Sequence, residues 1–292
     1  MDSPDKNSNN VKLVQTGTKL ANIGVLTIHE DGTISHENVD EVPYDPDLAN
    51  ETLNVTRSKK ECYVDKDMND FIKELNSGFS EQLQKVIGKT PFALTVYNSS
   101  SESRESHDQL SRIGENNLCN LVTDSFRILG EADVSIMNAG TVIQAGNITY
   151  QNIIDVMPFS NDVLIKEISG QGILDALEFG VRSLPEPTSR FPQVSGITFK
   201  IDESINSTVV VDDTESFLRV DGDRRVYDVK INGEDLVLNK NYTISSHSFI
   251  LDGGDGYSMF TPCEITKTAF GTDNDVLIRY ISENLGGVIP DT

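Results

Sequence analysis

Residues that usually build metal and disulfide sites are scarce in this sequence of 292 residues, which holds three cysteines, four histidines and no tryptophan. No Cys-x-x-Cys pair occurs, so a structural zinc site is not expected. None of the histidines (His29, His36, His107 and His247) lies three to five residues from another. A two-metal hydrolytic centre needs a denser set of His, Asp and Asn ligands, and we therefore expect no metal cofactor in this chain.

Long apolar stretches and positive charge are also lacking. No apolar run approaches the roughly 18 residues that span a membrane, and the polar opening MDSPDKNSNN does not resemble a signal peptide. Lysine and arginine total 24 against 46 aspartate and glutamate, so the formal net charge is −22. Nucleic acids and anionic membranes bind basic surfaces. We therefore expect neither as a partner, and any anion site must depend on one or two local arginines.

Cysteine and asparagine patterns bear on the cellular compartment. Cys119 falls in an apolar helical pattern and is expected to be a buried thiol. Cys62 and Cys263 could form a disulfide in an oxidising compartment, which the sequence does not decide. Six Asn-x-Ser/Thr sequons occur, and this number favours a secreted or cell-surface glycoprotein.

The first 88 residues divide into a polar tail, short strands and one helix. Residues 1–64 combine the tail, strand-like runs at 11–40 and a linker that contains Pro43 and Pro46. Apolar residues then recur at steps of three and four, which predicts a helix over 65–88 that ends at Gly88. We interpret this helix as a connection between two domains.

Residues 89–292 carry the pattern of an α+β domain, with a mixed sheet and flanking helices. Helices are predicted at 115–129, 149–157, 170–181 and 274–285, with Thr149 and Ser169 as N-caps. Strands are predicted at 133–138 and 161–169, and a meander of four strands over 196–249 turns at Asn232-Gly233.

The string LDGGDGYSMF at 251–260 is the strongest candidate for a ligand site. Three glycines crowd around Asp255, and glycine lets the backbone take positive φ and approach a ligand closely. The carboxylate could accept hydrogen bonds from sugar hydroxyls, and the nearby Phe249 and Tyr257 offer rings on which a base can stack. The alternative is a hairpin turn with Asp-Gly at its tip, flanked by core aromatic residues.

Four other side chains could complete such a site, although each also has a structural explanation. Arg112 precedes a helix and could grip a phosphate through its planar guanidinium, or pair with a neighbouring acid. Asn138 ends a strand and could reach a ligand or satisfy its own turn. Phe159 could face Phe249 across a purine or belong to the core. His247 lies between two serines on a predicted strand and is expected to be structural.

Taken together, these segments resemble the C-terminal domain of the 5′-nucleotidase family. The matching stretches are RIGENNLCNLVTDSFR, DVSIMNAGT, GNITYQNIIDVMPFSNDVLIKEISGQGILDALEFGV, SRFPQVSGITFKID and NYTISSHSFILDGGDGYSMF, in this order over residues 88–285. VKLVQTGTKLANIGVLTIHEDG is similar to the last strands of the family's N-terminal metallophosphatase domain, and the helix at 65–88 to its linker helix. The resemblance implies a family member without nearly all of its catalytic half.

In that family the N-terminal domain holds two divalent metal ions and hydrolyses the phosphate ester, while the C-terminal domain binds the nucleotide. The C-terminal domain clamps the base between two phenylalanines, bonds the ribose through the aspartate of a Gly-Gly-Asp-Gly loop, and meets the phosphate with arginines and an asparagine. Matched by motif position, these roles fall on Phe159 and Phe249, on Asp255 in the loop with Gly253 and Gly254, and on Arg112 and Asn138.

One stretch departs from the family pattern. Asn-Gly-Gly-Gly-Ile-Arg is usual where this chain runs from Asn138 to Ile143, so an isoleucine stands in place of an arginine that contacts phosphate. A second basic position is occupied by Gly114. Because the loss of a charged hydrogen bond costs about 1.5–3 kcal/mol, we expect weaker phosphate recognition with the base pocket kept.

The resemblance thus implies the nucleotide- or nucleoside-binding domain of a 5′-nucleotidase-like hydrolase, with its own N-terminal domain as partner. This chain alone is expected to bind substrate without hydrolysing it. One alternative is a non-catalytic secreted nucleoside-binding or interaction module, which the missing arginine favours. Another is part of a diphosphohydrolase or cyclic-nucleotide phosphodiesterase of the same family.

Overall fold

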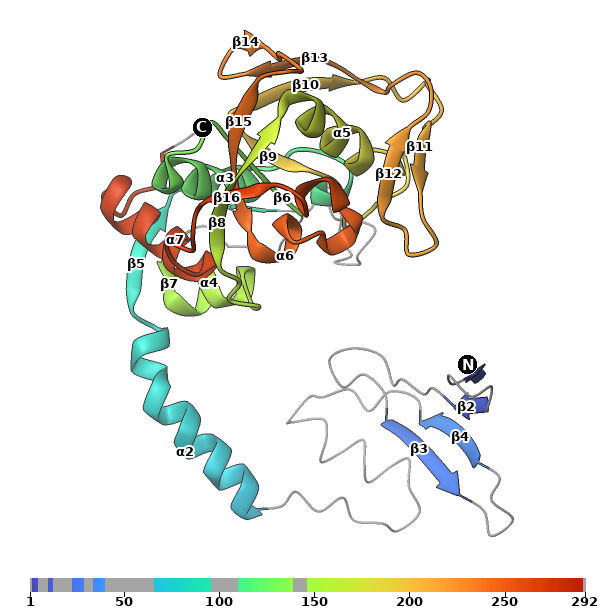
Figure 1. The fold of residues 1–292 in the computed structure, drawn as a ribbon. Coiled ribbons are helices and arrows are strands. Elements are labelled where there is room, and N and C mark those ends of the chain that lie inside the picture. Colours follow the sequence, from blue (N-terminus) through green and yellow to red (C-terminus); the bar gives the residue numbers. More distant parts are fainter. Residues whose placement is uncertain are drawn as a thin grey trace. The chain divides into compact units, whose positions relative to one another are not determined.

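The computed structural model describes residues 2–4, 10–12, 23–28, 34–39, 66–95, 110–138 and 146–290. The chain divides into two compact units, residues 1–76 and 77–292 (Figure 1). The domain boundaries expected at residues 64 and 88 remain predictions.

The first unit contains two antiparallel strand pairs. β1 (Asp2–Pro4) pairs with β2 (Asn10–Lys12), and β3 (Ile23–Ile28) pairs with β4 (Ile34–Val39). The strand-like runs predicted within 11–40 are therefore confirmed for β2, β3 and β4. The linker predicted at 41–64 lies outside the described residues.

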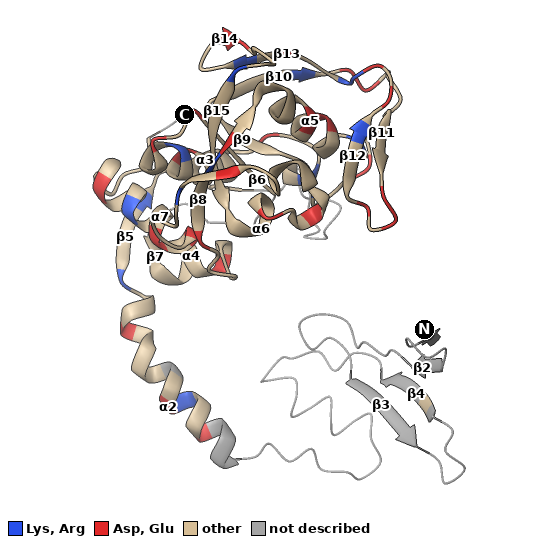
Figure 2. Ribbon diagram, viewed as in Figure 1, with Lys and Arg blue, Asp and Glu red and all other residues tan. Residues whose placement is uncertain are grey.

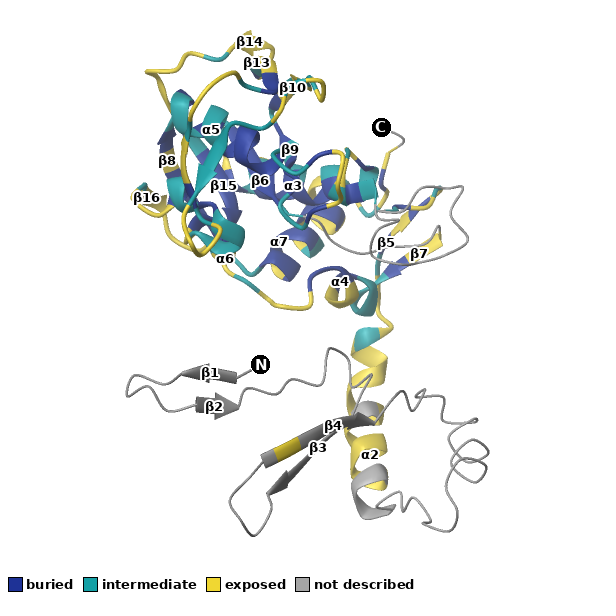
Figure 3. Ribbon diagram, turned by 90° about the vertical axis from the view of Figure 1, so that its right-hand side faces the viewer, coloured by how far each residue is buried: buried dark blue, intermediate teal, exposed yellow. Residues whose placement is uncertain are grey.

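Helix α2 (Lys66–Leu83) confirms the helix expected after this linker but is shorter than 65–88. Gly88 does not end it, because this glycine lies within strand β5 (Val86–Thr90). A Cβ at Gly88 would lie 2.6 Å from the side chain of Ile281, so the absence of a side chain permits close packing there. The apolar face of α2 is 45–57% exposed at Phe71, Ile72, Leu75 and Phe79, and Figure 3 shows the helix as a largely exposed element.

The second unit is built around a mixed five-stranded sheet with the strand order β16-β8-β15-β6-β9. These strands are β6 (Val134–Met137), β8 (Val163–Ser169), β9 (Gln193–Ser195), β15 (Asn241–His247) and β16 (Glu264–Lys267). β15 runs parallel to β6 and antiparallel to β8. The mixed sheet predicted from the sequence is therefore confirmed.

Both faces of this sheet are covered (Figure 1). Alternate residues of a strand point to opposite faces, so Val163 of β8 enters one core and Leu164 enters the other. The first core is enclosed by α3 (Asn117–Gly130), α4 (Tyr150–Val156), α7 (Asp273–Arg279), its π-helical continuation η5 (Tyr280–Asn284), and the pair of β5 with β7 (Gly146–Thr149). The second core lies under α5 (Gly170–Gly180), β10 (Ile197–Ile201), β13 (Val226–Ile231), and the hairpin of β11 (Val209–Val211) with β12 (Phe217–Val220). The exposed strand β14 (Glu234–Asp235) pairs with β13 at the edge of its sheet.

Two predicted helix caps are confirmed. The Thr149 side chain accepts a hydrogen bond from Asn152 N at the start of α4, and the Asn152 side chain accepts one from Thr149 N. Ser169 accepts from Gly172 N at the start of α5. Such caps satisfy backbone donors that have no partner inside the helix, and each contributes roughly 1 kcal/mol.

The predicted meander over 196–249 is only partly correct. β10 pairs with β13, and Asn232-Gly233 turns β13 into β14. However, residues 236–239 form no strand, because the carbonyls of Leu238 and Lys240 accept hydrogen bonds from the first amides of α5. β15 leaves the meander and lies between β6 and β8, since its side chains from Ile244 onward are buried on both faces.

Two further expectations concern the cysteines and membrane-spanning helices. Cys119 is buried in α3, as predicted. Cys263 carries a free thiol, which donates to Met259 O at 3.3 Å, and Cys62 lies outside the described residues. Within the part of the chain that the structure describes, no helix is both long and apolar enough to cross a membrane.

Acidic residues are dense in the loops between β10 and β13, as Figure 2 shows. Several of these carboxylates accept hydrogen bonds from residues in the same turn. Asp202 accepts hydrogen bonds from Ser204, and Asp212 accepts from Thr214, and these bonds lower the pKa of both acids. The turn chemistry of exposed loops therefore accounts for part of the acidity of the chain.

Candidate functional site

The glycine-rich segment at 251–260 follows the end of β15 in three short helical turns. These are α6 (Ser248–Leu251), η3 (Gly254–Gly256) and η4 (Ser258–Phe260). The strands on either side of this segment, β15 and β16, lie on opposite sides of β8 and do not pair with each other. The segment is therefore not a hairpin turn, which was the alternative explanation of its sequence.

The glycines of this loop are required by backbone conformation and by packing. Gly253 and Gly256 have φ values of 97° and 88°, which are accessible to glycine at little cost. A Cβ at Gly254 would lie 2.4 Å from Phe249 O and 2.7 Å from the Phe249 ring. The loop therefore lies directly against Phe249. Asp255 also has positive φ, at 54°, a conformation that aspartate adopts more readily than most residues.

Asp255 is held from two sides. Asn138 Nδ2 donates to Asp255 Oδ2 at 2.9 Å, and Arg190 Nε donates to the Asp255 backbone carbonyl at 2.8 Å. Asn138 follows β6, and Arg190 lies in the loop between α5 and β9, so distant parts of the chain meet here. The half-buried carboxylate is thus fixed in place through one of its oxygens.

His247 extends this network beneath the acid. Because a carboxylate only accepts hydrogen bonds, the Asn138 nitrogen must face Asp255, and Asn138 Oδ1 must accept from His247 Nε2 at 3.1 Å. Nε2 therefore carries the proton. Nδ1 is buried without a partner among the described residues. Burial lowers the pKa of His247 to about 4 despite the nearby Asp255, so the imidazole is neutral at pH 7. This supports the structural role expected for His247.

Phe159 and Phe249 emerge from the same end of the β8–β15 pair. Val163 of β8 lies opposite His247 of β15, and Ser248 N donates to Asp162 O at 2.7 Å. Phe159 is 81% exposed and Phe249 is 45% exposed. These two large apolar side chains are therefore available to a ligand, and their action as a clamp on a base remains a prediction.

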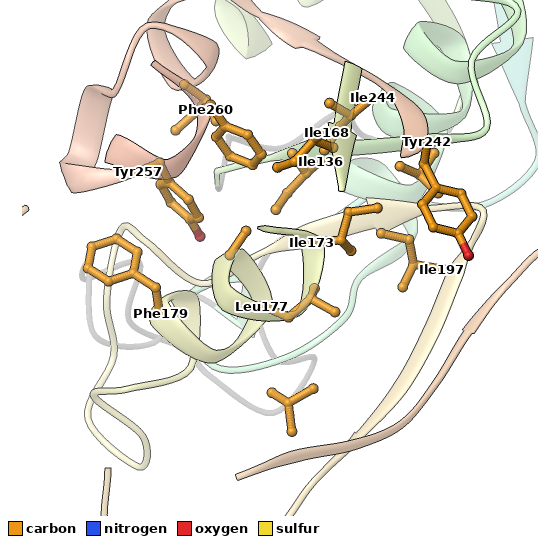
Figure 4. Close-up of a cluster of buried hydrophobic side chains, with 14 of the residues drawn as sticks. Ile136, Ile168, Ile173, Leu177, Phe179, Ile197, Tyr242, Ile244, Tyr257 and Phe260 are labelled. Atoms are coloured by element: carbon orange, nitrogen blue, oxygen red, sulfur yellow. The ribbon is translucent and has the colours of Figure 1, made fainter. Parts of the chain in front are cut away.

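Tyr257 does not offer a stacking surface, although the sequence suggested it as a candidate. It is 1% exposed, and its ring stacks on Phe260 at 5.7 Å and meets the edge of Phe179 at 5.0 Å. Figure 4 shows its ring between these two residues in the second core. The hydroxyl donates to Arg190 O at 2.5 Å, and burial raises the pKa of Tyr257.

Arg112 is connected to the same region through the loop that carries Arg190. It ends η2 (Leu110–Arg112), and its carbonyl accepts a hydrogen bond from Thr188 N at 3.1 Å. Arg190, two positions after Thr188, reaches Asp255. Contact of Arg112 with a phosphate remains a prediction, and Ile143 lies outside the described residues.

Sequence reasoning missed two residues of this region. Arg190 lies in the stretch SRFPQVSGITFKID that carries the family resemblance, but no role was predicted for it, because it belongs to an irregular loop. Lys166 had a weak signal, since it is a charged residue inside the apolar run from Val163 to Ile168. Its burial shows that the run is central in the sheet rather than half exposed.

Two hollows of about 250 and 270 Å³ lie elsewhere, along α3 and β9. The first is lined by Asp124, Arg127 and Tyr280, and none of the seven predicted site residues lines either hollow. Their volumes fall below the roughly 300–1,000 Å³ of ordinary ligand pockets. The candidate site at Asp255 is chosen instead for its side chains, a carboxylate fixed by Asn138 and exposed aromatic rings from neighbouring segments.

The described residues do not supply a metal centre. No group of three or more His, Cys, Asp or Glu side chains among residues 66–95, 110–138 and 146–290, or in the four short strands before them, is placed to hold an ion. The donor set of a two-metal hydrolytic site therefore does not fit this part of the chain.

Comparison with known proteins gives a match within the second unit. Residues 86–262 match the family model described as 5′-nucleotidase, C-terminal domain. A 5′-nucleotidase of Vibrio parahaemolyticus is 27% identical over 87% of this chain and 41% of its own length. The trifunctional nucleotide phosphoesterase protein YfkN of Bacillus subtilis is 31% identical over 51% of this chain and 10% of its own length.

A solved structure shows the same fold. The 5′-nucleotidase precursor of Thermus thermophilus superposes with a TM-score of 0.63 and 22% sequence identity, over 99% of this chain and 52% of that one. The chain thus spans about half of this structure and less than half of the two curated relatives.

Proposed function

The chain belongs to the family of 5′-nucleotidase C-terminal domains, and from this we propose that it binds a nucleoside or nucleotide at Asp255. The family supports a substrate-binding domain of a nucleotidase. In our proposal Phe159 and Phe249 hold the base, and the Asp255 carboxylate accepts hydrogen bonds from the ribose hydroxyls. The described residues bind and orient this substrate, while another part of the parent protein performs hydrolysis.

The arrangement around Asp255 is the observation that carries this proposal. Asn138 fixes one carboxylate oxygen and His247 fixes Asn138, so the acid is oriented before a ligand arrives. Phe249 lies against the same loop at Gly254, and the residue is 45% exposed. An oriented acceptor beside an exposed aromatic ring matches the two halves of a nucleoside, a polar sugar and a flat base.

The phosphate end of the site is proposed to be weaker than in typical family members. Asn138 already donates to Asp255, and isoleucine stands at position 143 where the family has an arginine. Arg112 supplies the positive charge that we expect to meet the phosphate. We therefore expect a nucleoside to bind nearly as tightly as its 5′-monophosphate.

A titration of the full chain tests both parts of the proposal. Isothermal titration calorimetry with adenosine, AMP and ribose 5-phosphate should show saturable binding of the first two and little of the third. Guanosine and cytidine titrations define the base preference. No heat or thermal shift with any nucleoside would overturn the proposal.

The variant Ile143→Arg sharpens the test at the phosphate. It should strengthen AMP binding by about tenfold or more, because one charged hydrogen bond contributes about 1.5–3 kcal/mol, and should leave adenosine binding unchanged. Ile143→Lys is the matched control for charge without the planar fork of arginine. Equal AMP affinity in all three proteins would refute the role given to position 143.

The N-terminal metallophosphatase domain of the parent protein is the proposed macromolecular partner. Support comes from α2, whose apolar residues Phe71, Ile72, Leu75 and Phe79 are exposed in the described part of the chain. Contiguous exposed apolar surface of this kind marks an interaction site. We propose a secreted or cell-surface location, as expected from the sequons.

A non-catalytic nucleoside-binding module is the second candidate. The isoleucine at position 143 favours it, since a protein that only retains nucleosides does not need a phosphate-binding arginine. Binding of adenosine with no gain for AMP in the protein that includes its metallophosphatase domain, together with no phosphate release, would support this second function over the first.

A further inference from the structure

Lys166 is a buried cation in the middle of strand β8. Leu164, Lys166 and Ile168 point to one face of the sheet, because alternate strand residues share a face, and the two apolar neighbours belong to the second core. Lys166 is only 3% exposed. A buried ammonium group lowers the stability of the fold unless it is paired and hydrogen-bonded. Lys166 therefore needs hydrogen-bond acceptors around its Nζ atom.

Three acceptors at the two ends of the glycine-rich loop supply these partners. Lys166 Nζ donates to Leu251 O at 2.7 Å and to Phe260 O at 3.1 Å, and it lies 3.3 Å from Asp252 Oδ1. An ammonium group has three donors, so all of them are used. Leu251 ends α6 and Phe260 ends η4, and carbonyls at helix ends lack partners within the helix. Lys166 therefore ties both ends of the loop to the central sheet.

The loop that Lys166 anchors carries the proposed substrate contacts. Asp255 lies between the two anchored carbonyls, and Phe249 packs against the loop at Gly254. We propose that Lys166 is a positioning residue, which fixes the loop so that Phe249 and Asp255 meet the same nucleoside. This inference rests on the proposed function and adds a residue that does not itself touch the ligand.

Arg225 provides a matched control. It is also a buried cation, 6% exposed, and its guanidinium donates to the backbone carbonyls of Ile205, Val181 and Leu184 rather than to those of the glycine-rich loop. Removal of either cation takes hydrogen-bond donors away from buried carbonyls and should destabilise the fold. Only the removal of Lys166 should release the loop.

The experiment compares Lys166→Met, Lys166→Arg and Arg225→Met in the full chain. Adenosine affinity is measured by calorimetry at a temperature where urea denaturation shows each protein to be folded. Lys166→Met should weaken adenosine binding by about tenfold or more, since a small misplacement of contact groups can cost a hundredfold. Arg225→Met should bind like the wild type, and Lys166→Arg should recover most of the affinity.

Hydrogen–deuterium exchange of the loop amides gives a readout that does not depend on the ligand. Exchange at residues 253–257 should rise in Lys166→Met and stay at the wild-type level in Arg225→Met. Unchanged loop exchange in Lys166→Met would overturn the positioning role, as would equal adenosine affinity in the two methionine variants.

The experiment distinguishes failure of the proposed function from failure of the positioning role. If the wild type binds no adenosine, the proposed function fails, whereas loop exchange still decides whether Lys166 fixes the loop. If Lys166→Met does not fold, Lys166→Gln, which keeps a hydrogen-bond donor, is measured by the same exchange experiment. The same comparison with Arg225→Met then decides the matter.

Discussion

Two sets of aromatic side chains lie in or beside the glycine-rich loop, and they differ in their exposure to solvent. Tyr257, Phe260 and Phe179 are at most 1% exposed and pack against one another, whereas Phe159 and Phe249 are 81% and 45% exposed. The first set is needed for the core. The second set contributes little to it, although a large exposed apolar ring has an unfavourable contact with water. The contrast agrees with the proposal that the exposed rings hold a ligand.

The largest effect on the free energy of unfolding is expected when a ring of the buried set is removed. Phe260→Ala should lower the free energy of unfolding by about 3–5 kcal/mol, because it removes a fully buried ring and leaves a cavity. Urea denaturation followed by circular dichroism measures this loss. The matched variant Phe249→Ala should change the unfolding free energy by less than about 1 kcal/mol. Similar losses in the two variants would contradict the division into core and ligand-binding rings.

The buried polar network should show itself in the pH dependence of stability. The pKa of His247 is about 4 in the folded chain and 6.5 ordinarily, so the unfolded state takes up a proton first as the pH falls. The contribution of neutral His247 to stability is complete above pH 6.5. As the pH falls from 6.5 to 4, its loss should decrease the free energy of unfolding by about 3 kcal/mol.

A variant isolates this contribution from that of the many carboxylates. His247→Gln keeps a donor toward Asn138 and cannot titrate, so its unfolding free energy should fall less between pH 7 and pH 4 than that of the wild type. Parallel curves for the two proteins would show that His247 is not buried in its neutral form.

The acid beside the exposed rings should matter for binding more than for folding. Asp255→Asn should lower adenosine affinity by about 1.5–3 kcal/mol through loss of a charged acceptor for the ribose. Calorimetry with 2′-deoxyadenosine and 3′-deoxyadenosine checks the cause. For each nucleoside, the ratio of its affinities for the wild type and for Asp255→Asn is compared. If a deoxynucleoside gives the same ratio as adenosine, the hydroxyl that it lacks does not contact Asp255.

The exposed rings should each contribute a somewhat smaller amount. Phe159→Ala and Phe249→Ala should each weaken adenosine binding by about 1–3 kcal/mol, the range for stacking of a base on an aromatic ring. Phe159→Tyr and Phe249→Tyr keep a flat ring and should bind close to the wild type. A loss confined to one of the two positions would replace the clamp by a single stacking surface.

The smallest effect is expected on α2, where exposure has a different explanation. Phe79 is 57% exposed on a helix that we propose contacts another domain. Phe79→Ser should change neither adenosine affinity nor the unfolding free energy of this chain by more than about 0.5 kcal/mol. A larger loss would show that the apolar face of α2 packs within the chain.

Local sequence signals predicted much of this fold. The helices α3, α4, α5 and α7, the caps at Thr149 and Ser169, and strands β6 and β8 follow from periodicity and capping chemistry, which depend on neighbouring residues. The short strands β9, β11, β12 and β16 were not predicted, because three or four residues carry too little pattern. The position of β15 between β6 and β8 was missed because distant partners decide it.

The candidate site shows the same limit. Asp255, Phe159 and Phe249 could be proposed because glycines and aromatic residues are visible in the sequence, and their contact with a ligand remains a prediction. Tyr257 was taken for an available ring, since a sequence does not show that the ring stacks on Phe260. Lys166 and Arg190 were missed because their roles depend on backbone carbonyls far along the chain.

A crystal structure of the chain with adenosine is the most direct test of the central claim. We predict that the base lies between the rings of Phe159 and Phe249 and that the ribose hydroxyls donate to the Asp255 carboxylate. Adenosine bound in the hollow lined by Asp124 and Arg127, or rings of Phe159 and Phe249 that stay apart from the bound base, would contradict it.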